Sequence, residues 1–370
     1  MAKVFLSLLL FLACAAPAAA AEQVQDKTVN ELAKVIAITQ EEDRPVPGTD
    51  VPGTFQTLRA EILEGTDKGT IVTVRNDYLV LKAGEEFYAL HTVDVLQGTD
   101  VYTVSEPYRL PQLAILVGVF VLAVILFGGI QGTRALISLI ASFLFIGYLL
   151  LPGILHGNSP ILVSLGAASL IIVLGSYITH GFSKVTTSAV LGMVATIAAT
   201  GLFSSFAIGY TRLSGFSSEE AVYLNFDTNG SINFAGLLLG AILIGLLGVL
   251  YDAAIGQAVA VDELRQAAPE ASRFVIYKRA LRIGREHIGA LVNTLAIAYV
   301  GVSLPLLLLF YNLAPDASIF TTLNREIFAT EVVRALIGGI GIVLTVPLTT
   351  LIASALLVVT PKGKNAILDP

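Results

Sequence analysis

The stretch QLAILVGVFVLAVILFGGI, residues 112–130, decides the fold class, because it contains no charged side chain. A helix needs about 20 mostly apolar residues to cross roughly 30 Å of hydrocarbon. Similar apolar stretches, bounded by glycine, proline or charge, recur to the end of the chain. We therefore expect seven transmembrane helices, at residues 112–130, 135–151, 160–178, 187–208, 234–251, 288–311 and 332–359. The composition of 55% hydrophobic and 14% charged residues agrees with a polytopic α-helical membrane protein.

The N-terminus has the three parts of a secretory signal. Lys3 is followed by the apolar run Val4–Cys14 and then by small residues up to Ala21. We expect residues 1–21 to be removed, with cleavage near Ala20 or Ala21. Since Cys14 is the only cysteine, the mature chain has no thiol and no disulfide. A lipid-attachment box ending at Cys14 is the alternative, although Phe11 fits that pattern poorly.

The loops predict the orientation in the membrane. With the exported N-terminus outside, the basic residues fall mainly on the cytoplasmic side, as the positive-inside rule requires. The predicted inner residues are Arg134, Lys184, Arg265, Arg273, Lys278, Arg279, Arg282, Arg285, Lys362 and Lys364, whereas Arg212 and Arg325 fall in outer loops. We expect a multipass protein of the bacterial plasma membrane, with residues 22–110 outside and the C-terminus in the cytoplasm.

Residues 22–110 read as a small extracytoplasmic β domain, because short runs alternate branched or aromatic with polar residues. The expected strands are Val35–Ile38, Phe55–Leu63, Thr70–Val74, Glu86–Leu90 and Val101–Val104. Five short strands favour a closed or nearly closed barrel. We expect Pro45, Pro47, Gly48, Pro52 and Gly53 to form a stiff insertion outside the sheet. Such a domain is structural, or it binds a ligand or partner.

The remaining chain divides into a transmembrane domain at 111–360 and a tail at 361–370. Its cytoplasmic segment 252–286 reads as two helices broken near Pro269, the first continuing from the fifth span. The outer loop Gly209–Asn233 carries several aromatic residues. It is read as a solvated linker, or as an interfacial helix or lid.

Polar residues near the inner ends of the fifth and sixth spans are candidates for a path. Polar side chains in a bilayer are costly unless they pair or line a wet cavity. The candidates are Asp252, Gln257, Glu286, His287, Asn293 and Thr294. At 100° per residue Glu286 shares a helix face with Asn293, as His287 does with Thr294. A solvated helix end, contacts with lipid headgroups and an interhelical hydrogen bond are the alternatives.

The last span has a polar and small-residue face. Glu331, Gly338, Thr345 and Thr349 fall within about 40° of one line along the helix, with Arg334 beside them. We expect this face to point into the bundle, with Glu331 and Arg334 paired at i, i+3. Pro347 interrupts the backbone hydrogen bonds, which suits a transporter, whereas close packing explains the glycines equally well. The expected packing residues are Gly236, Gly240, Gly338, Gly341 and Pro347.

Signatures of catalysis are missing from the sequence. There is no H-E-x-x-H, no G-x-S-x-G and no nucleotide-binding G-x-x-x-x-G-K-[ST]. The histidines His91, His156, His180 and His287 belong to different segments, so we expect no metal site, no cofactor and no catalytic residues. The net charge of −6 reflects the acidic outer parts and says nothing about nucleic acid, which we exclude as a partner.

Several motifs resemble the YibE/F family of bacterial multipass membrane proteins. They are Gly284-Arg285-Glu286-His287-Ile288, Val292-Asn293-Thr294-Leu295, Leu304-Pro305-Leu306, Glu331-Val332-Val333-Arg334, Pro347-Leu348-Thr349-Thr350 and Tyr251-Asp252 with Gln257 and Val261. The likeness extends from the outer domain, at Gln56 and Glu64-Gly65, to the last span. One departure is that the family pattern has two acidic residues where this chain has Tyr251-Asp252. The resemblance implies a fold and no reaction.

Two function hypotheses follow. The first is a transporter, or an efflux or permease component, in which a solute or ion follows the polar residues and a proton uses His287 or a carboxylate. The second is a receptor or scaffold protein whose outer domain binds a ligand or partner. Expected partners are the lipid bilayer, a solute or ion, and a second copy or another membrane subunit.

Overall fold

A computed structural model describes residues 27–358, except 47, 49, 66, 78, 95–98 and 314–317. The predicted signal at 1–21, with Cys14, and the tail at 361–370 lie outside these residues. The chain divides into two compact units, Met1–Ala123 and Val124–Pro370.

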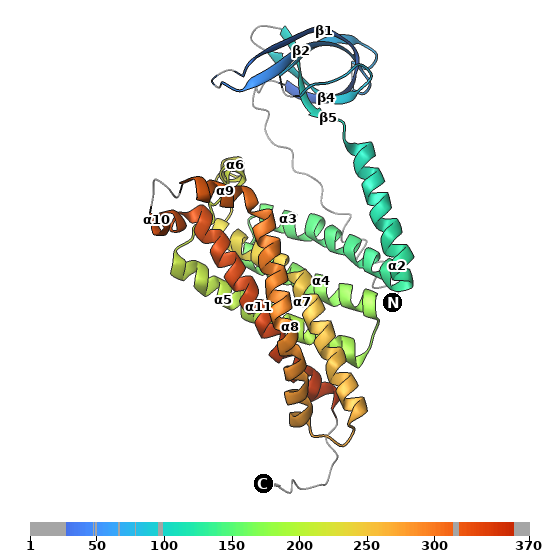
Figure 1. The fold of residues 1–370 in the computed structure, drawn as a ribbon, viewed down its shortest axis with the longest axis vertical. Helices are drawn as coiled ribbons and strands as arrows, with labels where there is room; N and C mark the ends of the chain where they lie inside the picture. The colour runs from blue at the N-terminus through green and yellow to red at the C-terminus, as the bar shows by residue number, and fades with distance from the viewer. Residues whose placement is uncertain are drawn as a thin grey trace. The chain divides into compact units, whose positions relative to one another are not determined.

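The first unit contains a closed five-stranded barrel, which confirms the predicted barrel (Figure 1). Its strands are β1 (Lys27–Pro45), β2 (Pro52–Ile62), β3 (Ile71–Asn76), β4 (Glu86–Asp94) and β5 (Thr99–Pro107). They are ordered β1-β2-β3-β5-β4, with β4 closing on β1. The β3–β5 pair is parallel, and the other pairs are antiparallel.

The barrel interior is filled by the alternating apolar residues of its strands. Along β2, Leu58, Ala60 and Ile62 are fully buried, and Phe87 of β4 joins them. A side chain that points inward on each strand therefore lies in a dry core. This geometry makes any polar group in the same interior depend on partners from neighbouring strands.

The predicted non-sheet insertion after the first strand is wrong for most of its residues. Pro45 pairs with Pro52 and Arg44 pairs with Gly53, so β1 and β2 continue as a two-stranded extension. Proline is tolerated there because no third strand has to accept a hydrogen bond from it. Gly48, at φ +83°, lies in the connecting turn, while residues 47 and 49 lie outside the described part of the chain.

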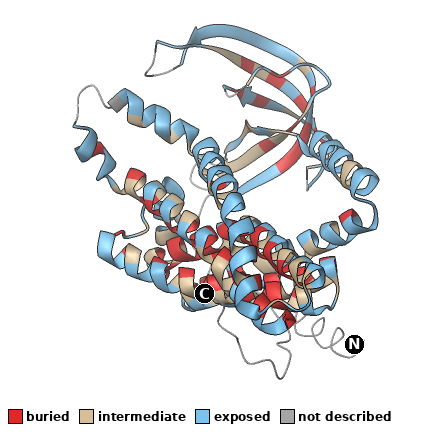
Figure 2. Ribbon diagram, turned by 60° about the horizontal axis from the view of Figure 1, so that its bottom comes forward, coloured by how far each residue is buried: buried red, intermediate tan, exposed pale blue. Residues whose placement is uncertain are grey.

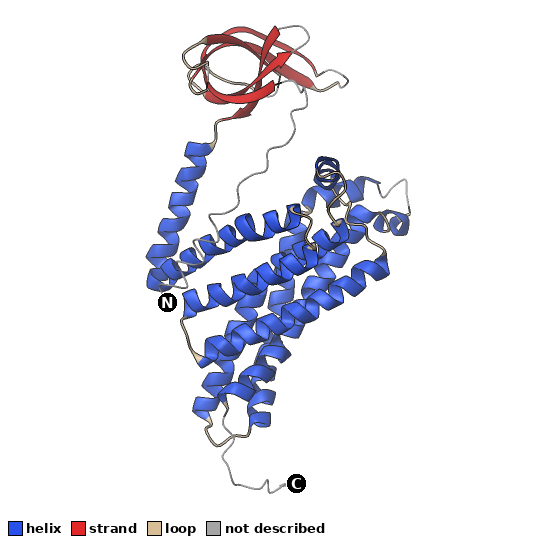
Figure 3. Ribbon diagram, turned by 180° about the vertical axis from the view of Figure 1, so that it is seen from behind, coloured by secondary structure: helices blue, strands red, loops and turns tan. Residues whose placement is uncertain are grey.

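Helices make up the rest of the described chain (Figure 3). They are α2 (Leu110–Phe145), the π-helix η1 (Ile146–Leu150), α3 (Leu151–Leu155), α4 (Pro160–His180), α5 (Lys184–Thr211), α6 (Glu219–Asp227), α7 (Phe234–Ala267), α8 (Arg273–Val302), α9 (Leu304–Leu313), α10 (Ile319–Leu323) and α11 (Glu326–Leu357). The predicted break near Pro269 falls between α7 and α8.

The described chain has five helices that are long and apolar enough to cross a membrane, or six if the bent pair α8–α9 is one span. This number is smaller than the seven expected because the first two expected spans, 112–130 and 135–151, fall in one continuous helical stretch, Leu110–Leu155. That stretch is not straight, since Gly129 has the non-helical angles φ 55° and ψ −138°. A side chain at Gly132 would collide with the carbonyl of Val124. In a straight helix these residues would be about 12 Å apart.

The core of the second unit lies between α4, α5, α7, α8 and α11, with α7 and α11 at its centre. Figure 2 shows buried residues gathered where these helices meet. Small residues allow the close approach, as is usual between membrane helices. An added Cβ would meet Ser164 at Gly240, Leu295 at Gly338 and Leu246 at Gly341, while Gly236 has only ordinary contacts and Pro347 lies inside α11.

Candidate functional site

A break in a membrane helix forms the centre of the candidate site. The sixth expected span, 288–311, is not one straight helix, because α8 ends at Val302 and α9 leaves it at 69°. Ser303 lies at the break. Pro305 explains it, since proline has no backbone N–H and disfavours the helical conformation of the preceding residue. The carbonyl of Gly301, four residues earlier, therefore has no helical donor.

The side chain at the break is tied to an ion pair on α11. Ser303 Oγ donates to Glu331 Oε2 at 3.0 Å, and Arg334 NH1 donates to Glu331 Oε1 at 2.8 Å. The Glu331 and Arg334 side chains are 24% and 26% exposed. The pair expected from the i, i+3 spacing is therefore present. It joins the interrupted helix to the polar face of the last one.

Two further polar atoms in this region have no partner among the described residues. They are Arg334 Nε and the Tyr299 hydroxyl oxygen, both buried. An added Cβ at Gly245 would lie 3.3 Å from that hydroxyl, and one at Gly338 would lie 3.6 Å from it. Tyr299 of α8 therefore extends between α7 and α11. Buried polar atoms of this kind need an explanation such as water, an ion or a moving part.

The loop between α5 and α7 lies at the same end of the bundle. Glu326 Oε1 accepts hydrogen bonds from Ser214 N, Ser214 Oγ and Gly215 N at 2.7–2.8 Å. The Phe216 ring lies 4.5 Å from the ring of Phe234. A hollow of about 230 Å³ lies under the loop, and Arg334 lines it together with residues of α6 and α7. One member of the ion pair, Arg334, therefore borders this hollow.

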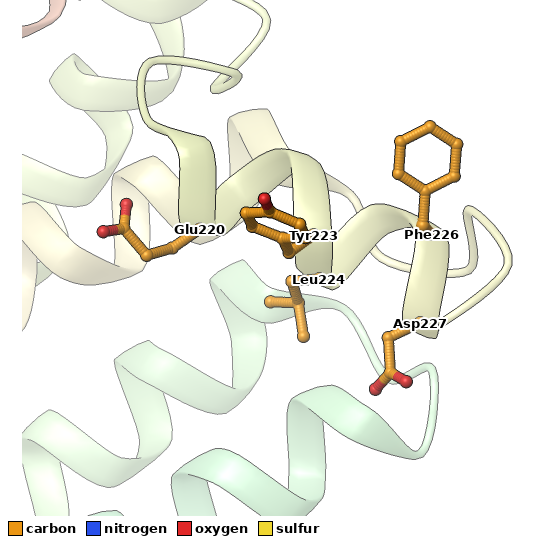
Figure 4. A pocket seen from close by; sticks show the side chains of 5 residues that line it. All are labelled: Glu220, Tyr223, Leu224, Phe226 and Asp227. Atoms are coloured by element: carbon orange, nitrogen blue, oxygen red, sulfur yellow. The ribbon is translucent and has the colours of Figure 1, made fainter. Parts of the chain in front are cut away.

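The loop between α5 and α7 contains the helix α6, and its predicted position at the membrane interface stays a prediction. A second, open hollow of about 690 Å³ lies along α6 and is lined by Glu220, Tyr223, Leu224, Phe226 and Asp227 (Figure 4). In Figure 4 the side chains of Phe226 and Asp227 point to opposite sides of the helix end. The two aromatic residues, Tyr223 and Phe226, are each 74% exposed. Exposed aromatic rings beside carboxylates suit a helix lying at a membrane surface.

The other candidate path residues are not gathered at this site. Gln257 is buried, and its Nε2 donates to the Ala280 carbonyl at 2.7 Å, so it joins α7 to α8. The remaining candidates are exposed within this chain: Asp252, Glu286, His287, Asn293 and Thr294. Thr294 bonds only to Ala290 of its own helix. The structure therefore brings together Glu331 and Arg334 of the expected path, and it does not connect them to the other residues.

Sequence reasoning missed a row of hydroxyl groups on α5. Thr196, Thr200 and Ser204 are all fully buried, at a spacing of four residues. Thr200 lies beside Gly341 of α11, and Thr349 of α11 lies beside Gly192. The spacing of four was the available signal. Thr196 donates to the Gly192 carbonyl of its own helix, as such hydroxyl groups commonly do, whereas the Thr200 and Ser204 hydroxyl groups have no partner among the described residues.

A family model described as YibE/F-like protein matches residues 116–359, which is more than half of the chain. The match covers the kinked first helix, the core of the bundle and the Ser303–Glu331–Arg334 cluster. It does not include the strands of the barrel. No curated protein matches the chain, and no solved structure matches it.

Proposed function

This chain belongs to the YibE/F-like family, and we propose that it is a transporter or permease component whose solute or ion passes the cluster of Ser303, Glu331 and Arg334. The family and the apolar helices indicate a membrane protein. The main support for this proposal is the 69° break at Ser303, whose side chain is hydrogen-bonded to a partly buried ion pair. Transporters commonly form their sites at interrupted helices, because the break frees backbone carbonyls.

The cluster has the parts that such a site needs. The free Gly301 carbonyl and the Glu331 carboxylate attract a cation or a donor group, while Arg334 attracts an anion or an acceptor. The hollow beside Arg334 supplies room for water or a small solute. We propose that a solute competes with Arg334 for Glu331 and that the α8–α9 break moves when the pair opens. The protein is then a carrier or channel and not an enzyme.

Flux through liposomes tests this proposal. The purified chain is reconstituted, and the fluxes of protons, alkali cations, chloride and small organic solutes are compared with empty liposomes. We expect Glu331→Gln and Ser303→Ala to reduce the flux of the active solute strongly, because both remove bonds at the break. Glu263→Gln, an exposed carboxylate of α7, is the matched control. Flux that is unchanged in both cluster variants, or that no solute shows, contradicts the proposal.

A second candidate is a subunit of a larger membrane assembly, including a receptor. It is favoured by Glu286 and Asn293, which are exposed on one face of α8 although polar groups facing lipid are costly. A partner helix would cover them. Cysteine placed at position 293 in a Cys14→Ser background tests this, with position 336, on an exposed part of α11, as control. Cross-linking at 293 alone supports an assembly, and equal cross-linking at both positions contradicts it.

We also propose seven spans in the bacterial plasma membrane, with the barrel outside and the C-terminus in the cytoplasm. The kink at Gly129 supports two spans within Leu110–Leu155, and the α8–α9 pair supplies another. The distribution of arginine and lysine supports the orientation. A reporter enzyme that works only in the cytoplasm, fused after Pro370, should be active. An inactive fusion at normal abundance, or a barrel protected from protease in spheroplasts, contradicts this topology.

A further inference from the structure

One oxygen of a buried carboxylate in the barrel has no partner among the described residues. Glu31 of β1 is 3% exposed, and its Oε2 atom is buried with no hydrogen-bond partner within the described chain. Leaving a buried charge unpaired is expensive, so such groups are normally paired, protonated or bound to a metal. Two other buried polar side chains of the barrel, Gln56 and Asn76, have partners.

Gln56 and Asn76 provide the comparison. Gln56 Nε2 donates to Glu41 Oε2 at 2.7 Å and to the Leu81 carbonyl at 3.1 Å. Its Oε1 accepts from Asn76 Nδ2 and from Leu81 N, both at 2.9 Å. The barrel therefore supplies partners for a buried amide. Within the described barrel, the buried side-chain atoms without a hydrogen-bond partner are Glu31 Oε2 and His91 Nε2, which belong to the same cluster.

Glu31 points toward two other groups that can bind a metal. One ligand atom each of Glu31, Asp67 and His91 lie within 4.8 Å of one another. They come from β1, from the β2–β3 turn and from β4. His91 Nδ1 is 3.7 Å from Asp67 Oδ2, and the two side chains are 13% and 37% exposed. Three converging ligands from three segments require the closed barrel to bring them together.

We propose that Glu31, Asp67 and His91 bind a divalent transition-metal cation, with zinc as the best fit. Two carboxylates and a neutral imidazole carry a charge of −2, which such a cation balances. The nitrogen ligand favours zinc or a similar metal over Mg²⁺ and Ca²⁺, which prefer oxygen ligands only. Three protein ligands leave a coordination position for water or another ligand.

The surroundings of the three residues match those of a metal site. His91 Nε2 lies 3.4 Å from Asp100 Oδ1 without making a hydrogen bond, so a carboxylate is near that nitrogen while Nδ1 faces Asp67. Tyr102 stacks on His91 with 4.2 Å between ring centroids, and its hydroxyl donates to Asp67 Oδ2 at 3.2 Å. These contacts hold the turn and the imidazole in one arrangement.

Without a cation, negative charge is poorly compensated here. Burial raises the pKa of Glu31, the Asp67 carboxylate raises it further, and His91 opposes both effects. Burial and the Asp67 carboxylate likewise raise the pKa of Tyr102 to about 12. Gly65, at φ +94°, leaves the space beside Glu31, since an added Cβ would lie 2.6 Å from Glu31 Oε1. The turn thus closes against the carboxylate without covering it with a side chain.

Titration of the purified full-length chain with zinc tests the inference. After treatment with a chelator and its removal, we expect one high-affinity Zn²⁺ per chain by calorimetry and only weak heats with Mg²⁺ or Ca²⁺. Glu31→Gln, Asp67→Asn and His91→Gln should each weaken zinc binding by at least the roughly 10–100-fold that loss of an outer-shell partner causes. Glu61→Gln on β2 and His156→Gln outside the barrel are matched controls, because both residues are exposed.

Stability supplies a second measurement, in case a variant folds poorly. Zinc should raise the unfolding midpoint of the wild-type barrel, since a ligand of the folded state stabilises it. This increase should be lost in Glu31→Gln, whereas the chelated variant should be at least as stable as the chelated wild type because a neutral amide replaces a buried acid. No stoichiometric zinc binding, binding unchanged in Glu31→Gln and Asp67→Asn, or equal affinity for Mg²⁺ overturns the inference.

Discussion

Buried polar groups that have hydrogen-bond partners find them in different ways in the barrel and in the helical bundle. In the barrel, Gln56 takes its partners from residues at least 15 positions away. In the bundle, Thr196 and Thr345 donate to carbonyls four residues earlier on their own helices, at 2.8 Å. Strand carbonyls are used by neighbouring strands, while a helix always offers a nearby carbonyl. Removal of a buried polar group should therefore lower the stability of the barrel more than that of the bundle, except where the bundle buries charge.

The two regions also differ in how they treat a buried carboxylate. Glu331 in the bundle has Arg334 and Ser303, whereas Glu31 Oε2 in the barrel has no partner among the residues that the structure describes. In the bundle, compensation comes from Arg334 on the same helix and from Ser303 at the α8–α9 break. In the barrel, it requires a proton or a bound cation. Four substitutions test this difference, beginning with the one expected to have the largest effect.

Arg334→Met should destabilise the bundle by about 3 kcal/mol, because it leaves Glu331 unpaired in a partly buried position. Unfolding of the purified protein in detergent measures this. The double variant Glu331→Gln with Arg334→Met should recover part of the loss, since no charge is then left alone. A double variant less stable than Arg334→Met would show that the pair is not the reason.

Gln56→Leu should destabilise the barrel by about 2 kcal/mol, because Asn76 and the backbone of Leu81 lose buried partners. The midpoint of barrel unfolding, followed by circular dichroism in the β region, gives the value. Gln40→Leu, on an exposed position of β1, is the matched control and should change little. Equal effects of the two substitutions would refute the claim that the network stabilises the barrel.

Gly341→Val should cost about 1–3 kcal/mol, because an added Cβ lies 2.5 Å from Leu246 and overpacks the core. Gly339→Val on the same helix meets no atom within 4 Å and should cost less. Thermal unfolding of both variants in one detergent separates packing from helix propensity, because the same residue is introduced. A larger loss at position 339 would argue against this packing of α11.

Thr345→Val should have the smallest effect, below about 1 kcal/mol. The hydroxyl bonds only to Gly341 of its own helix, so that carbonyl keeps its backbone partner and no distant group is left unpaired. Its unfolding is measured beside Gln56→Leu. If the threonine variant loses more stability than the glutamine variant, the difference between bundle and barrel in the treatment of polar groups does not hold.

Long apolar runs and alternating strands were readable from the sequence, because each depends on a local period. The runs predicted the helices of the bundle, and the alternation predicted all five strands. Helix breaks were less accessible. Pro305 was visible, but whether a proline bends a membrane helix depends on the neighbours that satisfy the freed carbonyl. The extension at Pro45 and Pro52 was missed because composition alone does not specify strand pairing.

The candidate sites divide in the same manner. Glu331 and Arg334 were found as a pair because they are three residues apart on one helix. The expected polar path was too broad, since helix periodicity gives a shared face without saying which face is buried, and Asn293 proved exposed. The barrel cluster was missed because the search for metal ligands followed histidines alone. Its carboxylates lie in separate segments, so no spacing marks them.

The sequence by itself determined that this chain has membrane-spanning helices and a small β domain, because hydrophobicity and its period act over a few neighbouring residues. Only the tertiary structure decided which polar groups meet. Ser303 contacts Glu331 from 28 residues away, and Glu31 meets Asp67 and His91 only when the barrel closes. Contacts of this range depend on packing and strand pairing, which have no local signature in the order of the residues.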